Sequence, residues 1–435
     1  MIGLLSKWEI FSKKFLANIS WTVLAKATAM LGFFALDICM ARILGKDSYG
    51  EWSFYYSAIL MMAHVCWFGI DASVKVFVSK QETEQELSDC LKASIRLRLI
   101  VSSLFLVGLT AASGLLTDYM EYFGKYENLH ILMYGAGVLV FLSSFAEFYK
   151  ALSIGMQEYR NLFLVTLTEY GGYFVFSLAA VLFLKNNTGL LAGYIIAGIL
   201  TALLGQALIR KHLLQDQAER AGVLQKEILL YAMPLLVTSM GEILLQESDT
   251  FFLGLFSIPA QVSVYAIGKK LCSKLYHINY TLCITVLPQM STISKENYRE
   301  KLDRFRKFGI LNILLTLCVA VGLLVMSGFF IPFLYGEEYH DAVFLFRLLL
   351  IYYVQRGISY YFALFLEFQK QAVFESICYF ITITANVILE ICLVSRLGAL
   401  GAALAAILSY LPYTILVTVK AVRVMRQYKS VYAAD

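Results

Sequence analysis

Charged residues are scarce in this chain, and so are prolines. Of its 435 residues only 15% are charged and five are proline, and all five prolines lie in the second half. Ordinary globular domains carry about 25% charged residues, so the deficit argues against a water-soluble protein. Hydrophobic residues make up 59% of the chain. The composition therefore indicates a protein that has lipid as its main solvent.

Motifs for covalent or metal chemistry are also missing. The eight cysteines show no CxxC spacing and seven of them lie in apolar segments, which predicts membrane packing instead of a disulfide framework or a metal site. We find no GxxxxGK[ST] phosphate loop and no nucleophile–base constellation. The longest polar connection, residues 291–307, is a short basic run. We therefore expect no enzyme activity, no metal and no cofactor.

Long uncharged runs identify the fold class. Residues 186–209, 308–336 and 397–419 contain no Lys, Arg, Asp or Glu, and each run exceeds the roughly 18 residues that a helix needs to span hydrocarbon. We predict an all-α polytopic membrane protein. The predicted spans, about twelve in number, are 15–40, 52–78, 95–117, 129–153, 161–184, 188–209, 228–255, 262–290, 308–331, 342–366, 371–394 and 397–420.

The basic residues outside the spans fall mainly on one side of the membrane. One set of alternate connections holds only five of them, Arg42, Lys46, Lys125, Lys185 and Arg396, whereas the remaining connections and both chain ends hold most of the others. Because Lys and Arg concentrate on the cytoplasmic side of membrane proteins, we predict a multi-pass protein of the cytoplasmic (inner) cell membrane with both termini in the cytoplasm. The net charge of +5 lies at these membrane boundaries, so no nucleic-acid partner is expected.

The two halves of the chain show a weak internal repeat. A shift of 212 residues superposes Asp37 on Asp249 and Gln157 on Gln369. This common offset predicts two six-helix lobes related by a parallel repeat. The predicted domains are an N-terminal lobe at 1–212, a cytoplasmic linker at 213–227 and a C-terminal lobe at 228–435.

Eight basic residues interrupt the predicted spans, although a charge at mid-bilayer costs about 2.5–3.5 kcal/mol. They are Lys26, Lys75, Lys150, Lys269, Lys270, Lys274, Arg347 and Arg356. Lys75 lies four residues after Asp71, which predicts a local ion pair on one helix face. Lys150 lies three residues after Glu147 and predicts a second such pair. Arg347 lies near the outer end of its span, where a long side chain reaches water.

The other basic residues have no acid partner nearby in sequence. Arg356 lies between Tyr352 and Tyr360, with no acid within a turn. Lys270 and Lys274 recur on one face of the eighth span together with His277. Such side chains face a polar cavity or the interior of the helix bundle, because contact with lipid is too costly.

Polar residues also mark three other spans. Lys26 lies near the middle of the first span, and Asp37 follows about three turns later. His64 lies near the middle of the second span. In the seventh span Thr238, Glu242, Gln246 and Asp249 form a continuous stripe. A structural network of interhelical ion pairs and a working polar cavity are both compatible with this pattern.

Four segments resemble the polysaccharide flippases. They are NISWTVLAKATAMLGFFALDICMARILGKDSYGEWSF at 18–54, AMPLLVTSMGEILLQESDTFFLGLFSIPAQVSVYAIGKKL at 232–271, LYGEEYHDAVFLFRLL at 334–349 and LGALGAALAAILSY at 397–410. The resemblance implies the multidrug/oligosaccharidyl-lipid/polysaccharide exporter superfamily, whose fold (that of MATE transporters) has two six-helix lobes in a V. It also implies transport of polyprenyl-diphosphate-linked oligosaccharides for bacterial surface polysaccharide such as O-antigen, capsule or exopolysaccharide, with polysaccharide polymerase machinery and membrane lipid as partners.

A diphosphate-sugar headgroup is large and anionic, so its transporter needs fixed positive charge at depth. We assign substrate binding to Lys26, His64, Lys270, Lys274 and Arg356. We assign gating or ion coupling to Asp37, Glu242, Gln246 and Asp249. Sodium, protons or consumption of the flipped product remain open as the energy source.

Three alternatives stay open beside the oligosaccharide flippase. Glu242, Glu247 and Asp249 favour a multidrug or cation antiporter of the same superfamily. A lipid II flippase is less favoured, because such proteins usually have fourteen helices. A membrane-embedded glycosyltransferase or polysaccharide polymerase would need a larger extramembrane region than this chain has.

The topology gives the first testable prediction. Reporter fusions at Lys125 and Glu338 should report the outer side of the membrane, and a fusion at Arg304 should report the cytoplasm. Both expectations follow from the distribution of basic residues. If the fusions at Lys125 and Glu338 report a cytoplasmic location, the assignment of depth along every span is wrong.

Overall fold

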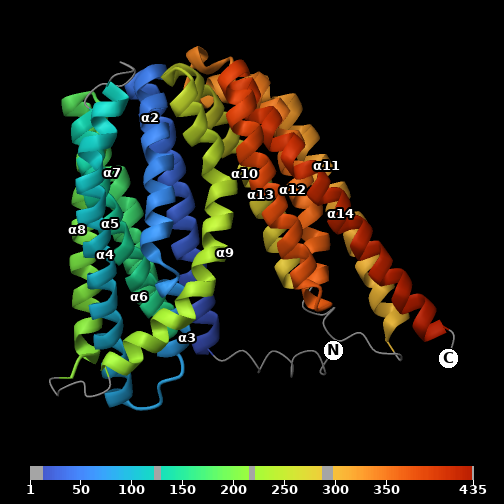
Figure 1. Ribbon diagram of the computed structural model, residues 1–435, viewed down its shortest axis with the longest axis horizontal. Helices are drawn as coiled ribbons and strands as arrows, with labels where there is room; N and C mark the ends of the chain where they lie inside the picture. The colour runs from blue at the N-terminus through green and yellow to red at the C-terminus, as the bar shows by residue number, and fades with distance from the viewer. Residues whose placement is uncertain (1–12, 122–128, 215–220, 287–296, 434–435) are drawn as a thin grey trace. The chain divides into compact units, whose positions relative to one another are not determined.

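A computed structural model describes residues 13–121, 129–214, 221–286 and 297–433, and within these ranges all regular structure is helical (Figure 1). The long helices are α2 (Lys13–Trp67), α4 (Glu84–Glu121), α5 (Leu129–Gly155), α8 (Asn187–Ile209), α9 (Ala221–Phe256), α10 (Pro259–Val286), α11 (Tyr298–Tyr335), α12 (Ala342–Phe368), α13 (Ala372–Leu397) and α14 (Ala399–Ala433). The shorter elements are α3 (Ile70–Val78), α6 (Tyr159–Thr166), η2 (Leu167–Gly171), α7 (Gly172–Leu184), η3 (Arg210–His212) and η5 (Glu337–Tyr339).

Each predicted span coincides with helical structure. Among the described residues nine helices are long and apolar enough to cross a membrane, or up to ten if a bent pair within α9 is counted as one span. The first of the nine, in α2, holds the predicted span 15–40 and the first part of the predicted span 52–78, which α3 continues, and the two are joined at Gly45, which has φ 76° and ψ 175°. α10 carries three lysines and is not among the nine, but it covers the predicted span 262–290 up to Val286. Pro288 and residues 287–290 lie outside the described residues.

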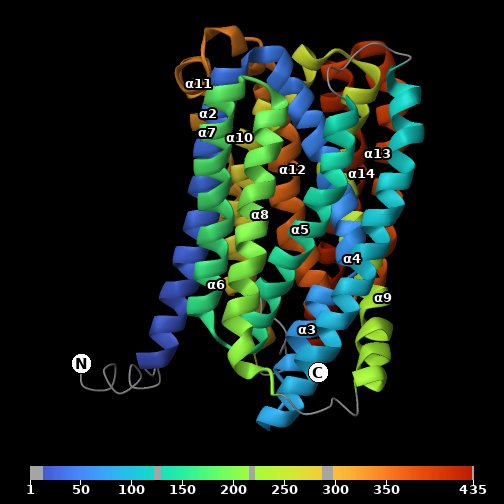
Figure 2. The same ribbon diagram turned by 90° about the vertical axis from the view of Figure 1, so that its left-hand side faces the viewer.

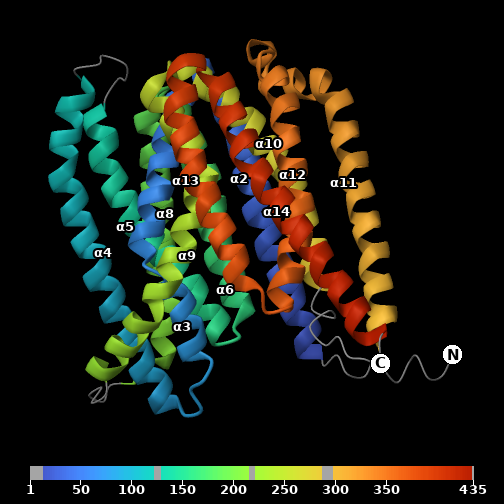
Figure 3. The same cartoon turned by 45° about the vertical axis from the view of Figure 1, so that its right-hand side comes forward.

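The chain divides into two compact units, residues 1–243 and 244–435. In the first unit α5 packs against α2, α3, α4, α6 and α8, and α7 packs against α8 (Figure 2). In the second unit α12 packs against α10, α11 and α14, and α13 packs against α14 (Figure 3). Part of the predicted linker 213–227, residues 215–220, lies outside the described residues, and the limits of the two predicted lobes remain a prediction.

Helix ends repeat between the two units. Gln157 (φ 58°) follows α5 and Lys370 (φ 60°) follows α12, and these two left-handed residues are 213 positions apart. Lys185 (φ 52°) follows α7 and Gly398 (φ 56°) follows α13, again 213 positions apart. A left-handed residue ends a helix and redirects the chain. The recurrence agrees with the parallel repeat predicted from the sequence offset of 212.

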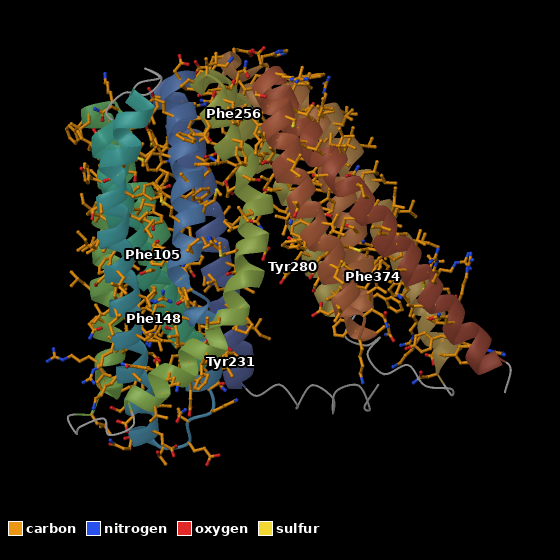
Figure 4. All side chains as sticks on the ribbon, in the orientation of Figure 1. Phe105, Phe148, Tyr231, Phe256, Tyr280 and Phe374 are labelled. Atoms are coloured by element: carbon orange, nitrogen blue, oxygen red, sulfur yellow. The ribbon has the colours of Figure 1, made fainter. Side chains whose placement is uncertain are left out.

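Many large apolar side chains are exposed on the outside of the helices, and some polar and charged side chains are buried between them (Figure 4 draws the described side chains as sticks). Phe183 is 88% exposed and Phe380 is 70% exposed, whereas Arg98 is fully buried. The interior is largely apolar as well, so the difference from a water-soluble protein lies in the many large apolar side chains on the surface, which suits hydrocarbon surroundings.

Arg98 corrects one prediction. Its guanidinium pairs with Asp71, donates to the carbonyl oxygens of Cys66 (3.3 Å) and Trp67 (3.4 Å), and lies 5.4 Å from the ring centroid of Phe148 (labelled in Figure 4). The predicted local pair of Asp71 with Lys75 was therefore wrong. Arg98 is buried on α4 beside the end of α2, so it, and not Lys75 on the helix of Asp71, forms the ion pair with Asp71. The second predicted local pair, Glu147 with Lys150, is confirmed.

α9 bends by 44° between its segments Gly222–Leu236 and Ser239–Phe256. Pro234 lies inside this helix just before the bend. Proline removes one backbone hydrogen bond and its ring clashes with the preceding turn, so it accounts for the kink. The first segment is held close to the turn before α3, because a Cβ at Gly69 (φ 68°) would lie 2.5 Å from the carbonyl oxygen of Ala232.

Small residues let α7 and α8 approach closely, and the GLLAG sequence at 189–193 supplies them on α8. A Cβ at Gly193 would lie only 2.3 Å from the Cα of Ser177. Gly193→Ala should therefore push the two helices apart and cost about 1–3 kcal/mol, as overpacking does. The measurement is the melting temperature and monodisperse yield of detergent-purified protein.

Gly108→Ala is the matched control, because a Cβ at Gly108 would have no neighbour within 4 Å. This control should equal the wild type or exceed it slightly, since alanine favours helix more than glycine does. Equal stability of the Gly193 and Gly108 variants would contradict the close packing of α7 on α8.

Candidate functional site

A buried lysine joins two helices of the second unit. Lys269 on α10 places its Nζ 2.6 Å from Asp249 Oδ1, 2.9 Å from Thr250 Oγ1 and 3.5 Å from Glu247 Oε2, all on α9. Tyr265, one turn earlier on α10, donates a hydrogen bond to Asp249 Oδ2 (2.7 Å). The spacing of four residues places Tyr265 and Lys269 on the same face of α10. Asp249, 5% exposed, is thus held by a cation on one oxygen and a hydroxyl on the other.

A third carboxyl group lies next to this network. Glu390 on α13 is fully buried, and its Oε1 accepts a hydrogen bond from Ser248 (3.1 Å) on α9. Asn386, one turn earlier, accepts a hydrogen bond from Ser248 (3.2 Å) and donates one to Ser409 (3.2 Å) on α14. Glu390 Oε2 has no hydrogen-bond partner, and no cation within the described residues forms an ion pair with Glu390.

Carboxyl groups therefore outnumber basic groups where α9, α10 and α13 meet. Lys269 forms ion pairs with Glu247 and Asp249, and Lys270 also lies close enough to act on Glu247, whereas Glu390 has no ion pair within the described residues. A buried carboxylate without a cation is costly, and it is commonly neutralised by a proton or a bound cation.

Arg356 on α12 is buried among tyrosines and is only 4% exposed. Its guanidinium carbon lies 4.3 Å from the ring centroid of Tyr276 on α10, 5.8 Å from that of Tyr352 and 6.0 Å from that of Tyr410 on α14. Its Nε has no hydrogen-bond partner. No carboxylate of the described chain forms an ion pair with it, so the π faces of the tyrosines are its main electrostatic support. Tyr360 extends the aromatic wall, with its ring 5.8 Å from that of Tyr276.

The first unit contains a similar buried lysine. Lys150 on α5 pairs with Glu147 and with Glu169, whose Oε2 is 2.8 Å from its Nζ. Tyr173 donates a hydrogen bond to the other oxygen of Glu169 (3.3 Å). Glu169 lies in η2, a π-helical turn of the kind that often marks functional positions in helices. Lys150 and Lys269 do not occupy equivalent positions of the repeat, because the helices that carry them, α5 and α10, do not correspond between the two halves.

Asp37 and Asp249 are matched more closely. Asp37 on α2 is buried and accepts a hydrogen bond from Tyr49 (2.6 Å), which follows the break at Gly45. Asp249 accepts its hydrogen bond from Tyr265 after the break between α9 and α10. In each unit an acid late in one helical segment is held by a tyrosine early in the next.

The other predicted site residues are less buried. Lys26 and Glu242 are exposed, whereas Gln246, Lys270 and Lys274 are half-buried. His64 is half-buried, with its Nδ1 2.9 Å from the carbonyl oxygen of Leu60 and its ring 4.1 Å from that of Trp67. Lys26, Asp37, His64 and Glu242 belong to the first unit, and the other predicted residues belong to the second. The structure brings Asp249 and Arg356 into buried positions of one unit.

Sequence reasoning missed Lys269 and Glu390. Lys269 is one of the eight basic residues within the predicted spans, but the regular spacing of Lys270 and Lys274 favours those two as substrate-binding residues. Glu390 is the only charged residue between Glu375 and Arg396. An isolated acid within a membrane span is itself a sign of function or interhelical pairing, and this signal would have identified it.

The chain resembles known proteins over most of its length. The family model described as "Polysaccharide biosynthesis protein" matches residues 15–294. The probable low-salt glycan biosynthesis flippase Agl15 of Haloferax volcanii is 22% identical over 378 residues, which are 86% of this chain and 77% of that protein.

Two solved structures share the fold. An inward-facing multidrug resistance MATE family transporter of the MOP superfamily has a TM-score of 0.71 at 13% identity, over 94% of this chain and 99% of that chain. The lipid II flippase MurJ in an inward closed conformation has a TM-score of 0.70 at 15% identity, over 96% of this chain and 91% of that chain. The predicted fold class, an all-α membrane protein of two helical lobes like MATE transporters, is confirmed.

The Lys269 network makes a prediction about stability. Lys269→Met should strand Asp249 and Glu247 without their cation and cost about 3–5 kcal/mol, as loss of one partner of a buried pair does. Adding Asp249→Asn to Lys269→Met should restore part of the loss, because it removes the stranded charge. Folded yield and melting temperature in detergent measure both effects.

Lys307→Met is the control for Lys269→Met. Lys307 pairs with Asp303 (2.6 Å) on an exposed face, and exposed pairs contribute about 0–1 kcal/mol. If the Lys269 variant is as stable as this control, the ion pair does not hold α9 to α10.

Proposed function

The chain belongs to the polysaccharide biosynthesis protein family, and we propose from this premise that it is a flippase for lipid-linked oligosaccharides. The proposed cargo is an oligosaccharide joined through diphosphate to a polyprenyl lipid. It moves from the cytoplasmic to the outer leaflet of the cytoplasmic membrane, where polysaccharide polymerase machinery of surface polysaccharide synthesis receives it. The glycan flippase relative supports this cargo class.

The cargo dictates the chemistry that its transporter needs. The polyprenyl chain can stay in lipid, whereas the sugars and the diphosphate must cross a region of low dielectric constant. A diphosphate is stabilised there by guanidinium or ammonium groups. Sugar rings are commonly contacted by aromatic faces. A basic group at depth, flanked by aromatic side chains, therefore suits this cargo.

Arg356 is the observation that carries the proposal. It is a buried cation on a membrane-spanning helix, it has aromatic rings around it, and no carboxylate among the described residues pairs with it. A cation whose only role is structural normally has an acid partner, as Arg98 has in Asp71 and Lys269 has in Asp249. Arg356 retains its charge for an anionic group that the protein itself does not supply.

The remaining predicted residues complete the proposal. Lys270 and Lys274 lie on α10, the helix that also supplies Tyr276 to the aromatic surroundings of Arg356. We propose that they raise the positive potential along the path of the headgroup. Lys26 and His64 have the same proposed role on α2 of the first unit.

The excess of carboxyl groups near Glu390 supports coupling to a cation gradient. A sodium ion or a proton would balance the charge there, and Asp249 lies in the same group. We extend this proposal to Asp37, which has the same tyrosine partner in the first unit, and to Glu242 and Gln246 on α9. The same excess of acids is what favours the second candidate function, export of cationic compounds by a cation antiporter.

Transport by Arg356 variants tests the proposal. Arg356→Ala should reduce flipping of a labelled polyprenyl-diphosphate sugar in proteoliposomes on the order of tenfold or more, because a hydrogen bond to a charged group contributes about 1.5–3 kcal/mol. Arg356→Lys should keep part of the activity, since the charge remains. Protein abundance and melting temperature should change little.

Arg347→Ala is the matched control, because Arg347 lies on the same helix, is exposed and donates to Ser327 (2.9 Å). It should flip the cargo normally. Undiminished flipping by Arg356→Ala would refute an anionic cargo at this position. Export of a cationic dye that is unaffected by Arg356→Ala and driven by a sodium or proton gradient would favour the antiporter instead.

A further inference from the structure

A pocket of about 430 Å³ lies between α11, α12 and α14 of the second unit. Figure 3 shows the beginning of α11 and the end of α14 close together at the bottom of the view. Most of the pocket lining is apolar and comes from Leu302, Ile310, Ile313, Phe362, Val422 and Met425. Two charged side chains, Arg306 and Arg426, complete the lining.

One wall of the pocket is firmly built. Tyr361 on α12 donates a hydrogen bond to the carbonyl oxygen of Phe305 on α11 (2.5 Å), and the two rings are stacked with their centroids 4.5 Å apart. Gly309 makes room for this contact, because a Cβ there would lie 2.8 Å from the Tyr361 ring. The pocket is therefore a fixed feature of the packing between α11 and α12.

The two basic residues that line the pocket differ in ion pairing from the exposed basic residues next to Arg306 on α11. On the exposed part of α11, Arg304 pairs with Glu300 (2.5 Å) and Lys307 pairs with Asp303 (2.6 Å). Arg306 lies between them in sequence, yet it forms no ion pair within the described part of the chain. Arg426 on α14 likewise forms none there, and no acid lies three or four residues from it in sequence. Arg423 on α14 also forms none there, so Arg306 and Arg426 are distinguished from it by lining the pocket.

We propose that this pocket binds one anionic phospholipid, with an acyl chain among the apolar residues and the phosphate between Arg306 and Arg426. A small inorganic anion would not need the apolar interior. A neutral lipid would leave both arginines without a partner. An anionic phospholipid satisfies both parts, and juxtamembrane bases each contribute about 1 kcal/mol to such binding.

The charge asymmetry of the chain predicts that this lipid comes from the cytoplasmic leaflet. There it would join α14 to α11 and α12, because its lining residues come from all three helices. The binding is independent of the proposed transport of oligosaccharides. It concerns the stability of the second unit in the membrane.

The test is lipid binding to the purified full-length chain in a neutral detergent. Dioctanoyl phosphatidylglycerol should raise the melting temperature in a saturable manner, and phosphatidylcholine with the same chains should not. The double variant Arg306→Gln, Arg426→Gln should bind phosphatidylglycerol on the order of tenfold more weakly. Val422→Phe, which fills the pocket with apolar volume, should also weaken binding while the protein stays folded.

Arg304→Gln with Arg423→Gln is the control, because it removes two exposed bases of the same helices that do not line the pocket. It should bind phosphatidylglycerol like the wild type. Equal weakening in the control would show general surface attraction and refute the site.

Two further probes identify the ligand. Inorganic phosphate that stabilises the protein as well as phosphatidylglycerol does would mean an anion site without a lipid chain. A polyprenyl phosphate that binds much more tightly than phosphatidylglycerol would mean that the pocket serves the transported lipid. Either result overturns the assignment to phospholipid, and neither depends on whether the chain flips oligosaccharides.

Discussion

The cost of charge in hydrocarbon is the constraint on which this structure depends. The outer faces of the helices are apolar, so almost every charge at depth has to be met inside a helical unit. Lys269 meets Asp249 and Glu247 in the second unit, and Lys150 meets Glu147 and Glu169 in the first. The pairs of Lys269 link α10 to α9, and the pair of Lys150 with Glu169 links α5 to η2, whereas small residues bring α7 and α8 close together elsewhere. Helix association in lipid lacks the hydrophobic driving force that operates in water, so close packing and ion pairing between helices stabilise the units instead.

The proposed function rests on the charged groups that are not fully paired. Arg356 keeps a positive charge that tyrosine faces stabilise but do not neutralise, and Glu390 has an oxygen without a partner. The two groups have opposite sign and lie in the same unit. In the proposed function, Arg356 binds the anionic cargo and Glu390 belongs to the group of acids that takes up a cation or proton.

Much of the architecture was predictable because membrane spans depend on local composition. Within the described residues the predicted spans lie on helices, nine or up to ten of which are long and apolar enough to cross a membrane, and Glu147 and Lys150 form their local pair. The common offset between the halves recurs in the positions of left-handed residues. Arg356 was identified correctly as a base without an acid on its own helix, since the absence of an acid within one turn can be read along the chain.

The amino-acid sequence by itself determined the membrane environment, the helices, the repeat and the identity of the charges that require an explanation. Only the tertiary structure decided which charge meets which. Asp71 pairs with Arg98 on another helix instead of Lys75 on its own, and Lys269 instead of Lys270 reaches Asp249. The reason is geometric. The partner of a charge on another helix depends on the direction of its side chain around the helix axis and on its height along that axis. Adjacent residues differ in direction by a fraction of a turn, and the relative rotation of two helices leaves no periodic signal in the sequence.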